Sequence, residues 1–89
     1  MTRYTIRFER KAEKQFDAIR DVRLATAIRD AINALADDPR PPKCVKLVGK
    51  LDEWRIRVGT WRVVYRIEDT VLVVEVVRVA PRGEVYRGL

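Results

Sequence analysis

The sequence predicts an α+β domain in which two helices pack on one face of a curved antiparallel sheet. Three observations predict this class: an alternating segment near the amino end, two stretches of helical periodicity after it, and three strand-like segments beyond residue 51. The chain has 89 residues, the length of one domain with a small core, so we expect a single domain over residues 1–89. The expected element order is β-α-α-β-β-β.

The first strand and both helices are expected before residue 38. Apolar and polar residues alternate between residues 3 and 9, which predicts a strand. A helix is expected from about Arg10 to Ile19, and Asp21 is a suitable N-cap for a second helix. This second helix has to end before Asp38-Pro39, because the residue before a proline disfavours helical backbone. Its inward stripe consists of apolar residues at helical spacing: Leu24, Ile28, Ala31, Ile32 and Leu35.

The second half predicts a basic loop and three strands. The loop covers residues 38–50, and the strands run over about Asp52–Val58, Trp61–Ile67 and Val71–Val79. Gly59 occupies the first of two turn positions, which favours a type II′ hairpin because glycine readily adopts positive φ. The last strand is almost wholly apolar, so we expect it to be central and covered on one face by the helices.

Composition and charge exclude several classes of function. The net charge of +6 lies mostly in the second half, since residues 1–39 carry +1 and residues 40–89 carry +5. The chain has no histidine and one cysteine, which excludes an internal disulfide, zinc-finger sites and histidine-based acid–base catalysis. No apolar run is long enough to span a bilayer or to form a signal peptide, so we expect a cytoplasmic protein without a membrane partner.

Arginines alternate with apolar residues on both sides of the Gly59 turn, between residues 54 and 66. Successive side chains of a strand point to opposite faces, so the apolar set faces the core and the arginines face outward. Six arginines belong to this basic face, with Glu53 and Glu75 as the only acids among their strand neighbours: Arg55, Arg57, Arg62, Arg66, Arg78 and Arg82. Exposed strand arginines can simply keep a surface soluble, but this imbalance favours phosphate binding.

The residue types limit the chemistry that such a face can perform. Without histidine or metal ligands, the available phosphodiester reaction is attack of an RNA 2′-hydroxyl on its own phosphate, and we expect no metal or other cofactor. Tyr86 lies outside any apolar pattern and either stacks on a base or pins the tail, whereas Tyr4 and Tyr65 belong to the core. Cys44 lacks a histidine partner for nucleophilic catalysis. A plain nucleic-acid-binding domain is a further alternative, but no recognition helix is apparent.

The chain resembles the RelE/ParE superfamily of toxin–antitoxin toxins over nearly its whole length. The matching segments are Tyr4–Phe8, Asp38–Arg40, Lys46–Gly49, Trp54–Tyr65 and Arg78–Tyr86. RelE-like members are ribosome-dependent endoribonucleases that cut mRNA in the A site without a metal and leave a 2′,3′-cyclic phosphate. ParE-like members share the fold but inhibit DNA gyrase and are not nucleases.

The resemblance implies a role for each matching residue. Arg55 and Arg57 match two basic positions that are lysines in well-known RelE-like members. Arg62 matches the arginine that holds the scissile phosphate, and Arg82 matches the one assigned to the leaving group. Tyr86 matches the tyrosine that stacks on the substrate base and takes part in proton transfer. The remaining cations are expected to bind RNA: Lys46, Lys50, Arg66, Arg78 and Arg87.

The resemblance also implies partners. The pair Pro81-Arg82 followed by Tyr86 favours the RelE-like branch, with a ParE-like gyrase inhibitor as the alternative. The expected partners are a RelB-like antitoxin, laid across the helices and a sheet edge, and the small ribosomal subunit with its mRNA. Promoter DNA is expected only through the toxin–antitoxin complex.

Overall fold

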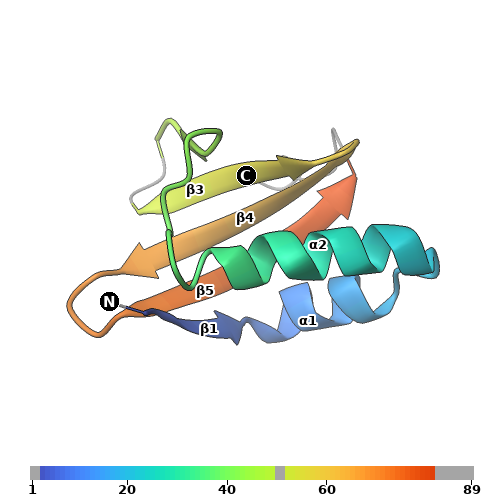
Figure 1. Ribbon diagram of the computed structural model, residues 1–89, viewed down its shortest axis with the longest axis horizontal. Coiled ribbons are helices and arrows are strands. Elements are labelled where there is room, and N and C mark those ends of the chain that lie inside the picture. Colours follow the sequence, from blue (N-terminus) through green and yellow to red (C-terminus); the bar gives the residue numbers. More distant parts are fainter. Residues whose placement is uncertain (1–2, 50–51, 82–89) are drawn as a thin grey trace.

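The computed structural model describes residues 3–49 and 52–81, which form one five-stranded sheet with two helices on one face (Figure 1). The strand order is β1-β5-β4-β3-β2. The elements are β1 (Thr5–Phe8), α1 (Arg10–Asp17), α2 (Val22–Ala34), β2 (Val45–Lys46), β3 (Glu53–Val58), β4 (Trp61–Glu68) and β5 (Val73–Pro81). The predicted α+β class and the helical layer are confirmed, and β2 is an additional short strand inside the predicted basic loop.

The sheet is mixed, which corrects the prediction of a wholly antiparallel one. β1 runs parallel to β5, with Thr5 opposite Val73 and Phe8 opposite Val76, while the other three strand pairs are antiparallel. Hairpin connections enforce antiparallel pairing, and β3, β4 and β5 follow one another through such turns. β1 reaches its neighbour only through the rest of the chain, so no hairpin fixes its direction. The central position predicted for the last strand is confirmed.

Local sequence signals account for most of the element ends. The Asp21 side chain accepts a hydrogen bond from the Leu24 amide at 3.1 Å, which is the predicted N-cap of α2. Gly59 has a φ of +61°, the positive value that the first position of a type II′ turn requires. Leu72 has a φ of +55°, and β5 therefore begins at Val73 rather than at the predicted Val71. α1 ends at Asp17, two residues before the predicted end.

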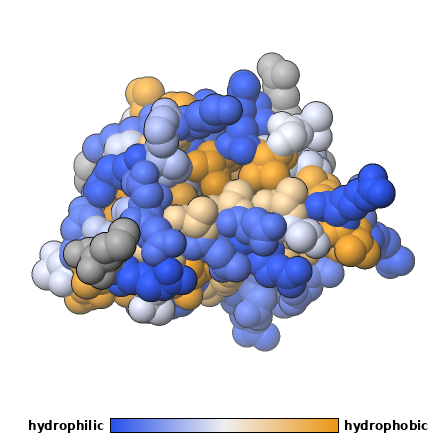
Figure 2. Space-filling view, in the orientation of Figure 1, coloured by the Kyte–Doolittle hydropathy of each residue, from blue (hydrophilic) through white to orange (hydrophobic). Residues whose placement is uncertain are grey.

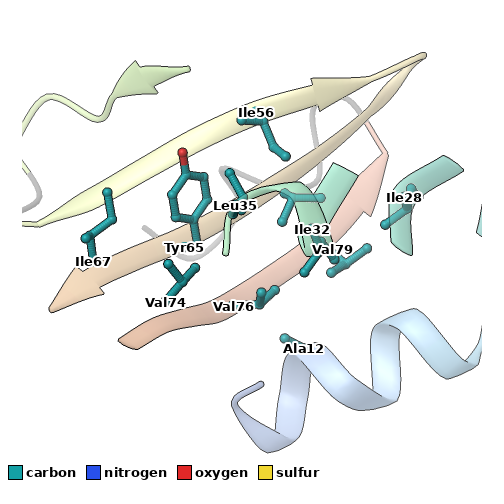
Figure 3. Packing of buried hydrophobic residues seen from close by; sticks show 11 residues of the cluster. Ala12, Ile28, Ile32, Leu35, Ile56, Tyr65, Ile67, Val74, Val76 and Val79 are labelled. Carbon is teal, nitrogen blue, oxygen red and sulfur yellow. The ribbon is translucent and has the colours of Figure 1, made fainter. Parts of the chain in front are cut away.

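The core lies between the helices and the sheet (Figure 3). Its fully buried members come from both helices and from β3, β4 and β5: Ala12, Ile28, Ile32, Leu35, Ile56, Val63, Tyr65, Ile67, Val74, Val76 and Val79. Tyr65 is wholly buried, as predicted, and its hydroxyl donates to the Pro39 carbonyl at 2.8 Å. Burial raises the pKa of this hydroxyl, so it remains a proton donor that ties the loop after α2 to the sheet.

A polar cluster joins β1, the β4–β5 turn and the loop after α2. The Asp69 carboxylate accepts hydrogen bonds from Tyr4 at 2.6 Å and from Arg40 at 2.9 and 3.3 Å. The Arg40 guanidinium also lies 5.3 Å from the Trp54 ring centroid, close enough for a cation–π contact. The hydrogen bonds from Arg40 and then Tyr4 hold the pKa of Asp69 below its ordinary value.

This lowered pKa predicts a pH-dependent contribution to stability. The contribution is complete above the ordinary aspartate pKa of about 3.9 and is lost as the pH falls through the lower pKa of the folded protein. Asp69→Asn is therefore expected to be less stable than the parent at pH 7, by a margin that narrows toward pH 3. Urea unfolding midpoints across this range measure the margin, and Glu68→Gln, an exposed neighbouring carboxylate, is the control. A margin that does not change with pH would contradict the prediction.

Candidate nucleic-acid interface

The face of the sheet opposite the helices carries the arginines, and strand register sets their arrangement. Arg57 lies directly opposite Arg62, and Ala80 follows on β5. In the next row Arg55 lies opposite Val64, which lies opposite Arg78. Directly opposed side chains have Cβ atoms about 4.5–5.5 Å apart. Arg55, Arg57, Arg62 and Arg78, hereafter the arginine cluster, therefore occupy neighbouring positions on three adjacent strands.

Acidic side chains on this face gather around a different arginine. Arg66 forms ion pairs with Glu9 at 3.2 Å, Glu53 at 3.4 Å and Glu75 at 3.3 Å. Partial burial opposes its charged form, but the three carboxylates together raise the pKa of Arg66. The two acids that the sequence places among the arginines are thus both paired with Arg66. This network distinguishes Arg66 by its three ion pairs from the arginine cluster, and it links β3, β4, β5 and the residue before α1.

Arg62 is on the predicted face but is buried, with 4% of its surface exposed. Its Nη1 donates to the Trp61 carbonyl at 3.3 Å. A small apolar cluster lies on the same face and consists of Val64, Val77 and Ala80, with Leu47 packed against it. The β-bulge between β4 and β5 accounts for Val77, because it shifts the register beside Val64 and Tyr65 and turns this side chain toward the outer face.

Beside the arginine cluster, at the β2 edge of the sheet, lies an open basin of about 590 Å³. It is lined by Lys43, Val45, Arg55, Arg57 and Gly59, and none of these residues is acidic. The Arg55 Nε is buried and has no hydrogen-bond partner among the described residues. Lys43, Arg55 and Arg57 form no ion pair within residues 3–49 and 52–81. An anion in this basin would meet three cations and no competing carboxylate.

The structure brings together only part of the predicted set. Arg55, Arg57, Arg62 and Arg78 are neighbours on one face, whereas Lys46 lies on the helix side, with its Nζ 5.9 Å from the Trp54 ring centroid. Four predicted site residues lie outside the described part of the chain: Lys50, Arg82, Tyr86 and Arg87.

Comparison with known proteins gives a consistent family. Residues 6–86 match the sequence model of the family described as "ParE toxin of type II toxin-antitoxin system, parDE". The chain belongs to this family, within the RelE/ParE superfamily. No curated protein sequence gives a significant match.

Solved structures similar to this chain include RelE proteins and their complexes with RelB. The toxin–antitoxin complex RelBE2 from Mycobacterium tuberculosis contains a chain 30% identical to this toxin, with a TM-score of 0.74, over 90% of this chain and 99% of that one. The isolated RelE toxin from E. coli is 26% identical over 93% and 90% of the chains, with a TM-score of 0.78. The RelE of an archaeal RelE–RelB complex from Pyrococcus horikoshii shares the fold at 24% identity, with a TM-score of 0.78 over 93% and 98%.

The sequence alone leaves Lys43 either in contact with a nucleic-acid backbone or in a solvated loop, and nothing in the pattern relates it to the arginines. Lys43 lies in the turn before β2, and only the fold places it beside Arg57 at the basin. Regarding membranes, no helix of the described residues has the length and apolar character to cross one.

Proposed function

We propose that this toxin is a RelE-type endoribonuclease that cleaves mRNA in the ribosomal A site. The observation that carries the proposal is the direct pairing of Arg57 with Arg62 across two strands. Two guanidinium groups on directly opposed positions can donate hydrogen bonds to the same phosphate, so this pairing supports an anionic ligand such as RNA. Arg55 and Arg78 in the next row extend the same patch, and Glu53 and Glu75, the acids on their own strands, are paired with Arg66. A ribosomal target places the protein in the cytoplasm.

The reaction requires charge stabilisation and transfer of a proton. The RNA 2′-oxygen loses its proton and bonds to phosphorus, the bond from phosphorus to the 5′-oxygen breaks, and that oxygen gains a proton. The products are a 2′,3′-cyclic phosphate and a 5′-hydroxyl. Arginine has a pKa above about 12, so Arg55, Arg57 and Arg62 act by positioning the phosphate and stabilising its developing charge. By resemblance, Arg82 is the arginine that acts on the leaving group, and Tyr86 takes part in proton transfer.

The match to the ParE toxin family model favours one alternative, a gyrase inhibitor without nuclease activity. Two assays on the purified toxin separate the proposals. A RelE-type toxin is expected to produce mRNA ends at A-site codons in a translation reaction and to leave gyrase supercoiling unchanged. A ParE-type toxin is expected to stop supercoiling while the mRNA stays intact, and this result would overturn the nuclease proposal.

We further propose a RelB-like antitoxin as the partner, since the RelE structures include complexes with RelB. Figure 2, which shows the helix side of the molecule, has a band of hydrophobic side chains across its middle. A hollow of about 260 Å³ on this side is lined by Ala31, Ala34, Leu35, Asp38, Pro41, Lys43, Ile56 and Arg57. An antitoxin segment lying here would reach the basin through Lys43 and Arg57. Promoter DNA would then be bound only by the complex.

A further inference from the structure

We propose that Lys43 extends the phosphate-binding surface of Arg55 and Arg57 and holds a second phosphate, that of the nucleotide next to the scissile phosphate. The RNA backbone would then run from the buried Arg62 toward the β2 edge of the sheet. This inference rests on the proposed RNA substrate and deepens it. It gives a role to Lys43 in place of Lys46, which lies on the other side of the sheet.

Lys43 lies beside the arginine cluster, in the turn before β2. Lys43 and Arg57 line both the basin and the hollow behind it, which brings the two cations to the same edge of the sheet. Val45 of β2 lies opposite Arg55, and Arg57 lies directly opposite Arg62 on β4. The cations therefore continue from the β2 edge toward β4.

The basin is a separate centre from Arg62. Its lining does not include Arg62, which is 4% exposed, whereas Lys43 and Arg57 are exposed. Its volume of about 590 Å³ lies within the range of about 300–1,000 Å³ that small-molecule sites occupy. It is therefore large enough for a nucleotide rather than for one phosphate group alone. Val45, which is 44% exposed, offers an apolar wall for the sugar.

The charges of the basin favour an anion. Three cations share it without an ion pair among the described residues. Asp38 lines the hollow behind the basin but not the basin itself, and its Oδ1 accepts a hydrogen bond from the Arg40 amide. A phosphate would relieve the mutual repulsion of the three cations and accept hydrogen bonds from them.

The test measures binding of a single-stranded RNA oligonucleotide whose 2′-oxygens are methylated, so that it cannot be cleaved. Lys43→Gln is expected to weaken binding about fivefold at low salt and to reduce the slope of log K against log salt by about 0.7, the value for one phosphate contact on a single strand. Lys43→Arg should restore the slope. The matched control is Lys11→Gln, which removes the same charge at an exposed position of α1, on the opposite side of the sheet, and should change neither quantity. Both lysines are exposed, so the unfolding midpoints should stay unchanged.

The outcomes separate this inference from the proposed function. Equal binding by Lys43→Gln and the parent, equal losses in Lys43→Gln and Lys11→Gln, or no binding by the parent would each overturn the subsite. If the parent cleaves mRNA in the translation reaction while Lys43→Gln binds normally, the nuclease proposal stands and the subsite fails. If binding depends on Lys43 but no mRNA is cut, the subsite stands and the nuclease proposal fails.

Discussion

Replacing Arg57 by glutamine is expected to reduce mRNA cleavage by about 100-fold and to leave the folded protein slightly more stable. Arg57 is exposed, forms no ion pair within the described residues and lies directly opposite Arg62. Removing one of two opposed like charges relieves a repulsion of about 0.2–1 kcal/mol. Removing a cation from the site where negative charge develops costs a much larger factor in rate.

Two measurements on the same preparation check this prediction. Urea unfolding gives the stability, and quantification of cleaved ends in the translation reaction gives the activity. The gain in stability should disappear in 1 M salt, where the screening length is about 3 Å. Arg23→Gln makes the same change of charge on an exposed position of α2 and should alter neither quantity. A loss of stability in Arg57→Gln would show that Arg57 supports the fold, and unchanged cleavage would remove it from the site.

The elements that could be predicted from sequence are those set by local signals. Alternation around Gly59 predicted β3, β4 and their turn, and Asp21 predicted the start of α2, because the cap, the turn and the two periodicities are encoded by neighbouring residues. The direction of β1 and the existence of β2 were not predictable in this way. β1 pairs with a strand to which only the rest of the chain connects it, and β2 has two residues, too few to show alternation.

The same distinction applies to the site. Alternation correctly predicted that Arg55, Arg57 and Arg62 share a face, because the side-chain period of a strand is fixed by its backbone. The burial of Arg62 and the three carboxylates around Arg66 depend on packing between distant segments. Neither is visible in a sequence pattern, because alternation predicts the face on which an arginine lies but not the carboxylates that pair with it.

The second large effect is expected on the opposite face of the sheet, where Ile28 of α2 is fully buried in the core. Ile28→Ala is expected to lower the free energy of unfolding by about 2–5 kcal/mol, because the lost contacts leave a cavity that the surrounding residues fill only in part. Small domains have a total stability of about 5–15 kcal/mol, so the fall in the urea midpoint should be large. Val22→Ala is the control on the same helix, since Val22 is 77% exposed and should change the stability by less than about 0.5 kcal/mol.

The activity of Ile28→Ala provides the contrast with Arg57→Gln. The arginine cluster lies on the outer face of the strands, whereas Ile28 lies in the core on the helix side. Cleavage per folded molecule should therefore match that of the parent at a temperature where the variant is folded. One variant then loses stability and keeps activity, and the other loses activity and keeps stability. A stability loss below about 1 kcal/mol in Ile28→Ala would contradict the assigned core. A parallel loss of activity in the folded variant would show that α2 positions the arginines through the sheet, because the two faces share the same strands.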